Sequence, residues 1–160
     1  MEERVVLLLG TNIGDKLDNL ERARLELTSE IGEIVTESAI YQTEPWGLKE
    51  QEAFLNQVIV VETLLRPMRI IENIWTIEKR MGRNKIEHWG PRIIDIDILF
   101  YGELIYEADD LKIPHPMLHE RKFTLVPLVE IMPKFNHPLL GKSMRQLLED
   151  STDSSAVNKI

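Results

Sequence analysis

The chain has 160 residues and a mass of 18.6 kDa, the size of one compact domain. Its 43% apolar and 29% charged residues are typical of a globular protein and exclude a wholly disordered chain. A net charge of −8 argues against a nucleic acid or an anionic membrane as the main partner, although it allows a small anionic ligand. The absence of cysteine excludes disulfides, thiolate metal sites and cysteine nucleophiles.

We expect neither a signal peptide at the N-terminus nor a membrane-spanning segment. The start is acidic and the apolar run from Val5 to Leu9 is too short for a signal peptide. No stretch approaches the ~20 apolar residues needed to cross a bilayer, so we expect a cytoplasmic protein. We expect a single domain over residues 1–150 and a polar, frayed C-terminal tail over residues 151–160.

Apolar periodicity predicts the order strand, helix, strand, strand, helix, strand, strand and then short helices. The predicted strands cover residues 5–9, 34–41, 53–63, 93–101 and 104–106, the last as the hairpin partner of the strand before it, and residues 109–121 are expected to be loop. The predicted helices cover residues 15–31, 67–81 and 123–131, with a last one opened by a capping box at Ser143. Adjacent strands without a helix between them predict an α+β sandwich with a mixed or antiparallel sheet.

The strand predicted over residues 93–101 carries Asp95 and Asp97 at alternate positions. Residues i and i+2 of a strand point to the same face, so these carboxylates project together while the isoleucines between them face a core. A hard divalent cation such as Mg²⁺ offsets the repulsion of such a pair and bridges it to substrate phosphates. The pair could bracket one ion or two, and an ordinary solvent-facing strand is the alternative that spacing leaves open.

Basic residues are concentrated in two stretches, although the chain as a whole is acidic. Five Lys and Arg residues stand against one carboxylate between residues 79 and 92, and three stand against one between residues 112 and 122. Cations beside a carboxylate pair suit a polyphosphate–metal complex, because positioned charges stabilise phosphoryl transfer. A solvated charged loop is the alternative, and the nearby aspartates favour phosphate binding.

Aromatic residues are few, and four of them fall in or beside predicted loops. Trp46 and Trp89 lie within loops, and Phe54 and Phe123 border them. One interpretation is a planar aromatic ligand stacked between such rings, and the other is that the rings seal the ends of the core. Asn56 offers an amide whose donor and acceptor would pair with the edge of a heterocycle.

A series of motifs runs in order along nearly the whole chain: Leu9-Gly-Thr-Asn-Ile-Gly-Asp15, Tyr41-Gln-Thr-Glu-Pro-Trp-Gly47, Phe54-Leu-Asn56, Ile77-Glu78, Gly82-Arg83, Trp89-Gly-Pro-Arg-Ile-Ile-Asp-Ile-Asp97, Ile113-Pro-His-Pro-Met117 and Glu120-Arg-Lys-Phe123. They resemble the signature of the 6-hydroxymethyl-7,8-dihydropterin pyrophosphokinase family of folate biosynthesis. The resemblance implies a ferredoxin-like α/β sandwich with one catalytic domain. It also implies transfer of pyrophosphate from ATP to the hydroxymethyl group of the pterin, release of AMP and the use of two Mg²⁺ ions.

The resemblance also implies roles for individual residues. The implied catalytic residues are Arg83, Arg92, Asp95 and Asp97, and the two aspartates are the implied ligands of Mg²⁺. The implied pterin-binding residues are Thr43, Pro45, Trp46, Phe54, Asn56, Trp89 and Phe123. The implied ATP-binding residues are Glu78, Arg83, Lys85, Arg92, Ile98, His115 and Arg121. The polar loop of residues 83–92 is expected to close over bound ATP and exclude water.

The chain departs from some family members on the nucleotide side. The departures are Trp75, Asn84, His88, Asp110 and Lys112. The expected partners are ATP and the pterin, with no nucleic acid and no membrane, and the next enzyme of the folate pathway is a further candidate. An alternative from another class is a non-catalytic ferredoxin-like module that senses a nucleotide or metabolite. The Asp pair argues against it, because a sensor does not need two metal-binding carboxylates facing its ligand.

Overall fold

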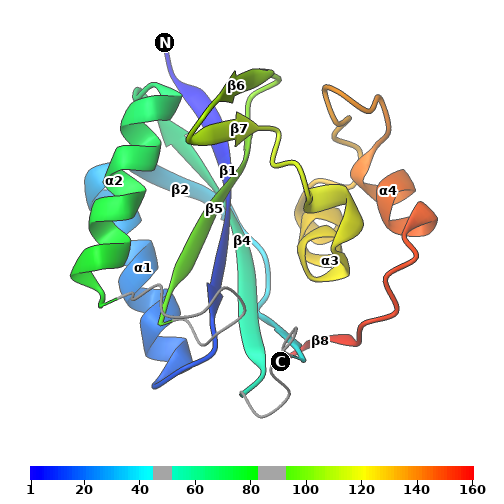
Figure 1. The fold of residues 1–160 in the computed structure, drawn as a ribbon, viewed down its shortest axis with the longest axis horizontal. Coiled ribbons are helices and arrows are strands. Elements are labelled where there is room, and N and C mark those ends of the chain that lie inside the picture. Colours follow the sequence, from blue (N-terminus) through cyan, green and yellow to red (C-terminus); the bar gives the residue numbers. More distant parts are fainter. Residues whose placement is uncertain (45–51, 83–92) are drawn as a thin grey trace.

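The computed structural model describes residues 1–44, 52–82 and 93–160 (Figure 1). The elements in chain order are β1 (Glu3–Thr11), α1 (Lys16–Glu30), β2 (Gly32–Glu37), β3 (Tyr41–Thr43), β4 (Phe54–Thr63), α2 (Pro67–Arg80), β5 (Asp95–Tyr101), β6 (Tyr106–Ala108), β7 (Leu111–Ile113), the 3₁₀ turn η1 (Leu118–Glu120), α3 (Lys122–Ile131), α4 (Met144–Asp150) and β8 (Val157–Lys159). Within these residues no helix is both long enough and apolar enough to cross a membrane.

A six-stranded sheet forms the centre of the described part of the chain. Its order is β5-β1-β4-β3-β8, and β2 also pairs with β4. The pairings described are all antiparallel. Helices α1 and α2 cover one face of the sheet, and α3 and α4 lie on the other (Figure 1). The α+β class with an antiparallel sheet, predicted from the sequence, is confirmed.

The central strands β1 and β4 are covered on both faces, which explains their long apolar runs. Alternate residues of β1 enter two different cores. Val5, Leu7 and Leu9 pack with α1 and α2, whereas Val6 and Leu8 pack with α3 and α4. Because side chains alternate, the register of each strand decides which face a functional residue occupies.

Local sequence signals set the helix starts. The side chain of Asp15 accepts the N–H of Asp18 at 3.1 Å and caps α1. Helix α2 has Pro67 in its first turn, where a missing N–H costs no hydrogen bond. Ser143 and Gln146 form the predicted capping box of α4. These three helix starts are confirmed.

Two of the sequence-based expectations about strands are wrong. The strand expected over residues 34–41 is divided into β2 and β3, because the backbone and hydroxyl of Ser38 bond to Val58 between them. The hairpin partner expected for β5 does not pair with it. Tyr106 instead lies opposite Ile113, so residues 106–113, which include part of the expected loop, form the separate hairpin β6–β7.

The C-terminal tail differs from the frayed segment that its polar composition predicts. Residues Val157–Lys159 form β8 and pair with β3, with Val157 opposite Thr43 and Lys159 opposite Tyr41. This pairing satisfies backbone N–H and C=O groups on the outer edge of β3. Composition did not reveal it, because main-chain hydrogen bonds require no apolar side chains.

Gly32 generates a test of the packing between β2 and β4. A Cβ added at Gly32 would lie 1.9 Å from the carbonyl oxygen of Glu62, so the strand would have to shift. We predict that Gly32→Ala lowers the free energy of unfolding by about 2 kcal/mol, measured by urea denaturation. Glu37→Ala, at the exposed end of the same strand, is the control and should change it by less than about 0.5 kcal/mol. Equal midpoints for the two variants would contradict the prediction.

Candidate active site

The edge strand β5 presents both aspartates on one face of the sheet. Asp97 lies opposite Leu8 of β1, and Asp95 lies opposite Gly10. Because Leu8 packs with α3 and α4, both carboxylates point to that face, where they are half-buried. Ile96, between them, packs into the core under α1 and α2. The shared face that the alternation predicts for the two aspartates is therefore observed.

One row of residues crosses four strands at this end of the sheet. Asp95 of β5, Gly10 of β1, Asn56 of β4 and Tyr41 of β3 are opposite one another in register, so they face the same side. The amide of Asn56 extends over β1 and donates to the carbonyl oxygen of Leu9 at 3.3 Å. A Cβ added at Gly10 would lie 2.8 Å from the amide nitrogen of Asn56. The missing side chain at Gly10 therefore makes room for the Asn56 amide. The Cα atoms of Asn56 and Asp95 are two strand spacings, about 10 Å, apart.

Thr43 and Phe54 extend this face toward β3. They lie opposite each other in the β3–β4 pair, and Phe54 is two residues from Asn56 on the same strand. The hydroxyl oxygen of Thr43 is buried, and it has no hydrogen-bond partner in the part of the chain that the structure describes. A buried hydroxyl without a partner costs about 1–3 kcal/mol. A ligand atom that bonds to this hydroxyl would recover that free energy.

Arg121 and His115 lie together beside the start of α3. The guanidinium carbon of Arg121 is 5.7 Å from the ring centre of Phe123. Burial, together with the positive charge of Arg121, lowers the pKa of His115 to about 4. The Nδ1 atom of His115 accepts the N–H of Met117 at 3.1 Å, so the neutral ring carries its proton on Nε2. The neutral Nε2–H of His115 and the positive guanidinium of Arg121 are both suited to bind phosphate oxygens.

A cleft of about 340 Å³ runs along the outer edge of β5. Helix α2, strand β5 and the β6–β7 hairpin form its walls. Its lining includes both aspartates and three of the predicted ATP-binding residues, Glu78, Ile98 and His115. The cleft therefore joins the carboxylate pair to a volume in the range of small-molecule sites.

Glu78 is buried on α2 and supports the strand segment between the aspartates. Its Oε2 atom accepts the N–H of Ile96 at 2.9 Å. Because β5 is at the edge of the sheet, the carboxylate takes the place of a neighbouring strand at this N–H. Glu78 thus positions the backbone that carries Asp95 and Asp97, a role that the sequence did not indicate.

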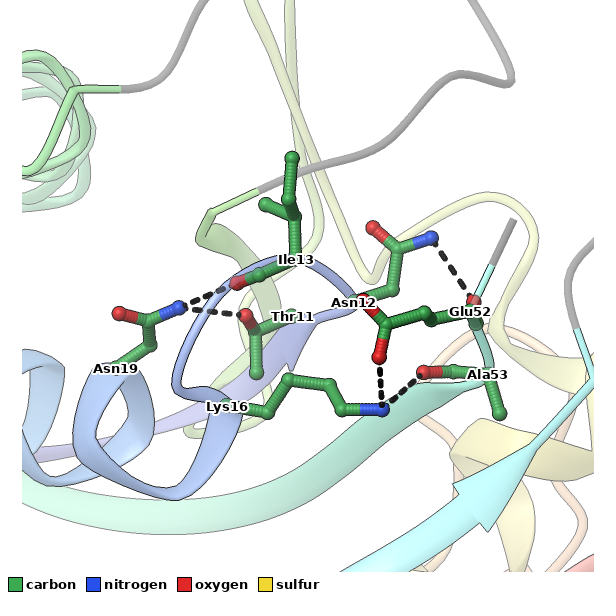
Figure 2. Close-up of polar contacts among 7 residues, drawn as sticks. All are labelled: Thr11, Asn12, Ile13, Lys16, Asn19, Glu52 and Ala53. Atoms are coloured by element: carbon green, nitrogen blue, oxygen red, sulfur yellow. Dashed lines mark hydrogen bonds and ion pairs between the residues drawn. The ribbon is translucent and has the colours of Figure 1, made fainter.

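The turn between β1 and α1 is braced against the start of β4 (Figure 2). The side chain of Asn12 donates to the carbonyl oxygen of Glu52 at 3.2 Å. The ammonium group of Lys16 donates to the carbonyl oxygen of Ala53 at 3.2 Å and lies 3.6 Å from the Glu52 carboxylate. Asn19 holds the turn from within through side-chain bonds of 3.1 and 2.9 Å. These contacts fix the backbone that leads into β4 and its aromatic first residue.

Several predicted site residues lie outside the described residues. They are Pro45, Trp46, Arg83, Lys85, Trp89 and Arg92, and the expected closing loop of residues 83–92 lies there too. The other predicted residues gather on the α3 face or along the cleft, although the side chain of Ile98 points into the core under α1 and α2.

Sequence reasoning missed two contributions to the site. Gly10 was missed because its place between Asp95 and Asn56 depends on long-range register. Asp109 and Leu111 line the cleft and were missed because the hairpin that carries them was not predicted. Trp75 and Lys112, named from the sequence as departures on the nucleotide side, line the same cleft, and Trp75 is 42% exposed.

The environment of His115 generates a prediction about its protonation. A folded pKa of about 4 lies below the ordinary value of 6.5, so the folded protein binds this proton less readily than the unfolded chain. The stability contributed by neutral His115 is therefore fully present above pH 6.5 and is lost as the pH falls toward 4. We predict that ¹⁵N NMR at pH 6 shows a neutral ring protonated at Nε2. Titration of His115 near pH 6.5 would contradict this account.

Comparison with known proteins identifies the family. The family model of 7,8-dihydro-6-hydroxymethylpterin-pyrophosphokinase (HPPK) matches residues 6–133. The 2-amino-4-hydroxy-6-hydroxymethyldihydropteridine pyrophosphokinase of Aquifex aeolicus is 38% identical over 148 residues, 92% of each chain. The protein of the same name from Methylorubrum extorquens is 39% identical over 158 residues, 98% of each chain.

A solved structure has the same fold. The crystal structure of wild-type Plasmodium falciparum HPPK-DHPS with pteroate matches with a TM-score of 0.73 at 18% identity. The match covers 93% of this chain and 42% of that one, so the chain spans less than half of the Plasmodium protein. The matches in sequence, which extend over almost the whole chain, show that it belongs to the 7,8-dihydro-6-hydroxymethylpterin-pyrophosphokinase family.

Proposed function

We propose that the α3 face of the sheet and the adjoining cleft carry out the reaction of this family. The protein is a pyrophosphokinase of folate biosynthesis that transfers pyrophosphate from ATP to 6-hydroxymethyl-7,8-dihydropterin and releases AMP. Family membership favours this enzyme over the sensing module. The row from Asp95 through Gly10 to Asn56 carries the assignment of residues, because it joins the carboxylate pair at the cleft to a buried amide.

The pterin binds at the β3–β4 side of the row in this proposal. The amide of Asn56 pairs with the heterocycle edge, and the hydroxyl of Thr43 bonds to a ring substituent. Phe54 and Phe123 stack on the two faces of the ring, because Phe54 shares the face of Asn56 and Phe123 lies in the first turn of the covering helix α3. Pro45, Trp46 and Trp89 remain predicted contributors to this site.

ATP occupies the cleft along β5, with its phosphates toward the aspartates. Asp95 and Asp97 supply the hard oxygen ligands that fit Mg²⁺, and two ions are part of the proposal. Bound Mg²⁺ supplies neutralisation of the phosphate charge. The described residues contain no cluster of three His, Cys, Asp or Glu side chains that could hold a metal, so the two aspartates are the residues that would hold Mg²⁺ here.

Several other side chains contribute to binding of the nucleotide. His115 donates from Nε2 and Arg121 supplies a positive charge to the phosphates, while Glu78 and Ile98 shape the wall of the cleft. Arg83, Lys85 and Arg92 remain predicted phosphate contacts. The neutral state of His115 lets it bond to phosphate without adding a charge.

Positioning and electrostatics account for the reaction in this arrangement. The hydroxymethyl oxygen of the pterin forms a bond to the β-phosphorus of ATP and loses its proton. The bond between the β-phosphorus and the bridging α–β oxygen breaks, and AMP leaves with that oxygen. The missing side chain at Gly10 lets the Asn56 amide lie over β1, on the side of the row toward the carboxylates. The residues that hold the pterin and those that hold ATP reduce the entropy cost of bringing the two substrates together.

The finer fold class and the partner are also part of the proposal. Two units, β1–α1–β2 and β4–α2–β5, form the sheet order β5-β1-β4-β2, which supports a ferredoxin-like arrangement. A folic acid synthesis protein of Dictyostelium discoideum is 42% identical over 136 residues, 20% of its length. Because this relative and the Plasmodium HPPK-DHPS are longer proteins, we propose the next folate enzyme as a partner. The cytoplasmic location stays a prediction.

The assay of the proposed function uses ATP, Mg²⁺ and 6-hydroxymethyl-7,8-dihydropterin. We predict AMP and the pterin pyrophosphate as products, and ADP release or no turnover would contradict the function. Asp97→Ala should lower kcat by at least about 10³-fold while circular dichroism stays unchanged. The variant would lack one ligand of the Mg²⁺ that neutralises the phosphate charge. Glu149→Ala removes an exposed carboxylate from α4, outside the lining of the cleft, and is the control, with kcat within about threefold. Near-normal kcat for Asp97→Ala would contradict the metal assignment.

A further inference from the structure

We propose that the C-terminal segment of residues 151–160 is a positioning element of the pterin site, with Asp153 as its central positioning residue. The segment contacts the two elements that carry opposite walls of the site, strand β3 with Thr43 and the first turn of α3 with Phe123. In Figure 1 the chain runs from α4 past the lower end of α3 to β8 beside β3. The inference rests on the proposed assignment of Thr43 and Phe123 to the pterin.

Asp153 caps helix α3 from outside the helix. The N-cap residue Arg121 makes no capping bond with its side chain, and the first N–H groups of a helix have no partner within it. The Oδ2 atom of Asp153 accepts the N–H of Lys122 at 2.9 Å, although 31 residues separate the two in sequence. A carboxylate is also stabilised by the positive end of the helix dipole. Asp153 thus fixes the backbone next to Phe123.

The carboxylate of Asp153 is itself held in place by the tail. Its Oδ1 atom accepts from the N–H and the hydroxyl of Ser155 at 2.9 and 2.6 Å, and the N–H of Asp153 donates to Ser151 at 3.2 Å. Burial raises the pKa of Asp153, but the bonds from Ser155 and from Lys122 outweigh burial and lower the pKa below its ordinary value. Both oxygens have fixed roles, so the capping group is preorganised.

The end of the same segment holds the other wall. Val157 lies opposite Thr43 in the β3–β8 pair, and the N–H of Ile160 donates to the carbonyl oxygen of Ile40 at 3.1 Å. Because β3 is only three residues long, pairing on both edges restrains it more than pairing with β4 alone. The segment therefore sets Thr43 and Phe123 relative to each other.

The position of the segment predicts which substrate responds to its loss. Strands β8 and β5 are at opposite edges of the sheet, and the aspartates and the cleft belong to β5. Loosening the segment should therefore raise the pterin KM more than the ATP KM, which it affects through Arg121, the residue before Lys122. General destabilisation would instead affect both substrates equally.

The experiment measures KM for each substrate and kcat for four variants. Asp153→Ala should raise the pterin KM at least about fivefold, with a smaller rise of less than about threefold in the ATP KM. Asp153→Asn keeps one acceptor oxygen, which can serve Lys122 but not Ser155 as well, and should recover part of the loss. Ser155→Ala leaves the capping oxygen in place and should give a smaller rise in the pterin KM. Asp150→Ala is the matched control, because this exposed carboxylate bonds to Lys142 at 2.8 Å, and both KM values should stay unchanged.

Hydrogen exchange separates positioning from folding. In Asp153→Ala the amide of Lys122 should exchange faster, whereas amides of β1 should keep their wild-type protection.

Equal pterin KM values for Asp153→Ala and Asp150→Ala, or an equal rise in both KM values, would overturn the inference while the function stands. If wild type fails to turn over the pterin, the proposed function is wrong, and retained pterin affinity in Asp153→Ala by calorimetry would overturn the positioning role as well. Should Asp153→Ala not fold, unchanged pterin KM in Ser155→Ala would overturn it.

Discussion

The register of β1 between β4 and β5 is the constraint on which the site depends. A shift of one residue would turn Asp95 and Asp97 toward the core under α1 and α2 and would move Asn56 away from Gly10. Such a shift would bury two carboxylates among apolar side chains, at a cost of several kcal/mol per charge. The alternating apolar residues of β1, which enter two cores, oppose the shift and thereby hold the polar row in place.

Neighbouring segments support the strands that carry this row. Glu78 accepts the N–H of Ile96 on the edge strand β5, and Lys16 donates to the backbone before β4. Asp153 caps α3, and Tyr41 joins β3 to that helix through a 2.5 Å bond to Glu130. Burial raises the pKa of Tyr41 to about 12, assisted by Glu130, so the phenol stays protonated and donates this bond. The two substrate regions therefore have separate supports.

Features with a local period could be predicted from the sequence, and features that depend on long-range pairing could not. The alternation in β5 placed both aspartates on one face, and capping signals placed the helix starts. Thr43 and Asn56 lie on the α3 face and His115 lines the cleft, whereas their roles in binding a ligand stay predictions. The place of Gly10 depends on which strands pair and in which register, so local sequence does not reveal it. Polar composition likewise concealed the tail, because its contacts are main-chain bonds and one carboxylate cap.

The measurement that most directly tests the central claim is the affinity of Gly10→Ala for the pterin, measured by calorimetric titration. The affinity of the same variant for ATP with Mg²⁺ is measured in parallel. The added Cβ would lie 2.8 Å from the Asn56 amide and would displace it, without altering the aspartates or the cleft on β5. The account predicts at least about a tenfold loss of pterin affinity, with nucleotide affinity within about twofold of wild type. Unchanged pterin affinity in a folded Gly10→Ala protein would contradict the claim that the row across β5, β1 and β4 forms the site.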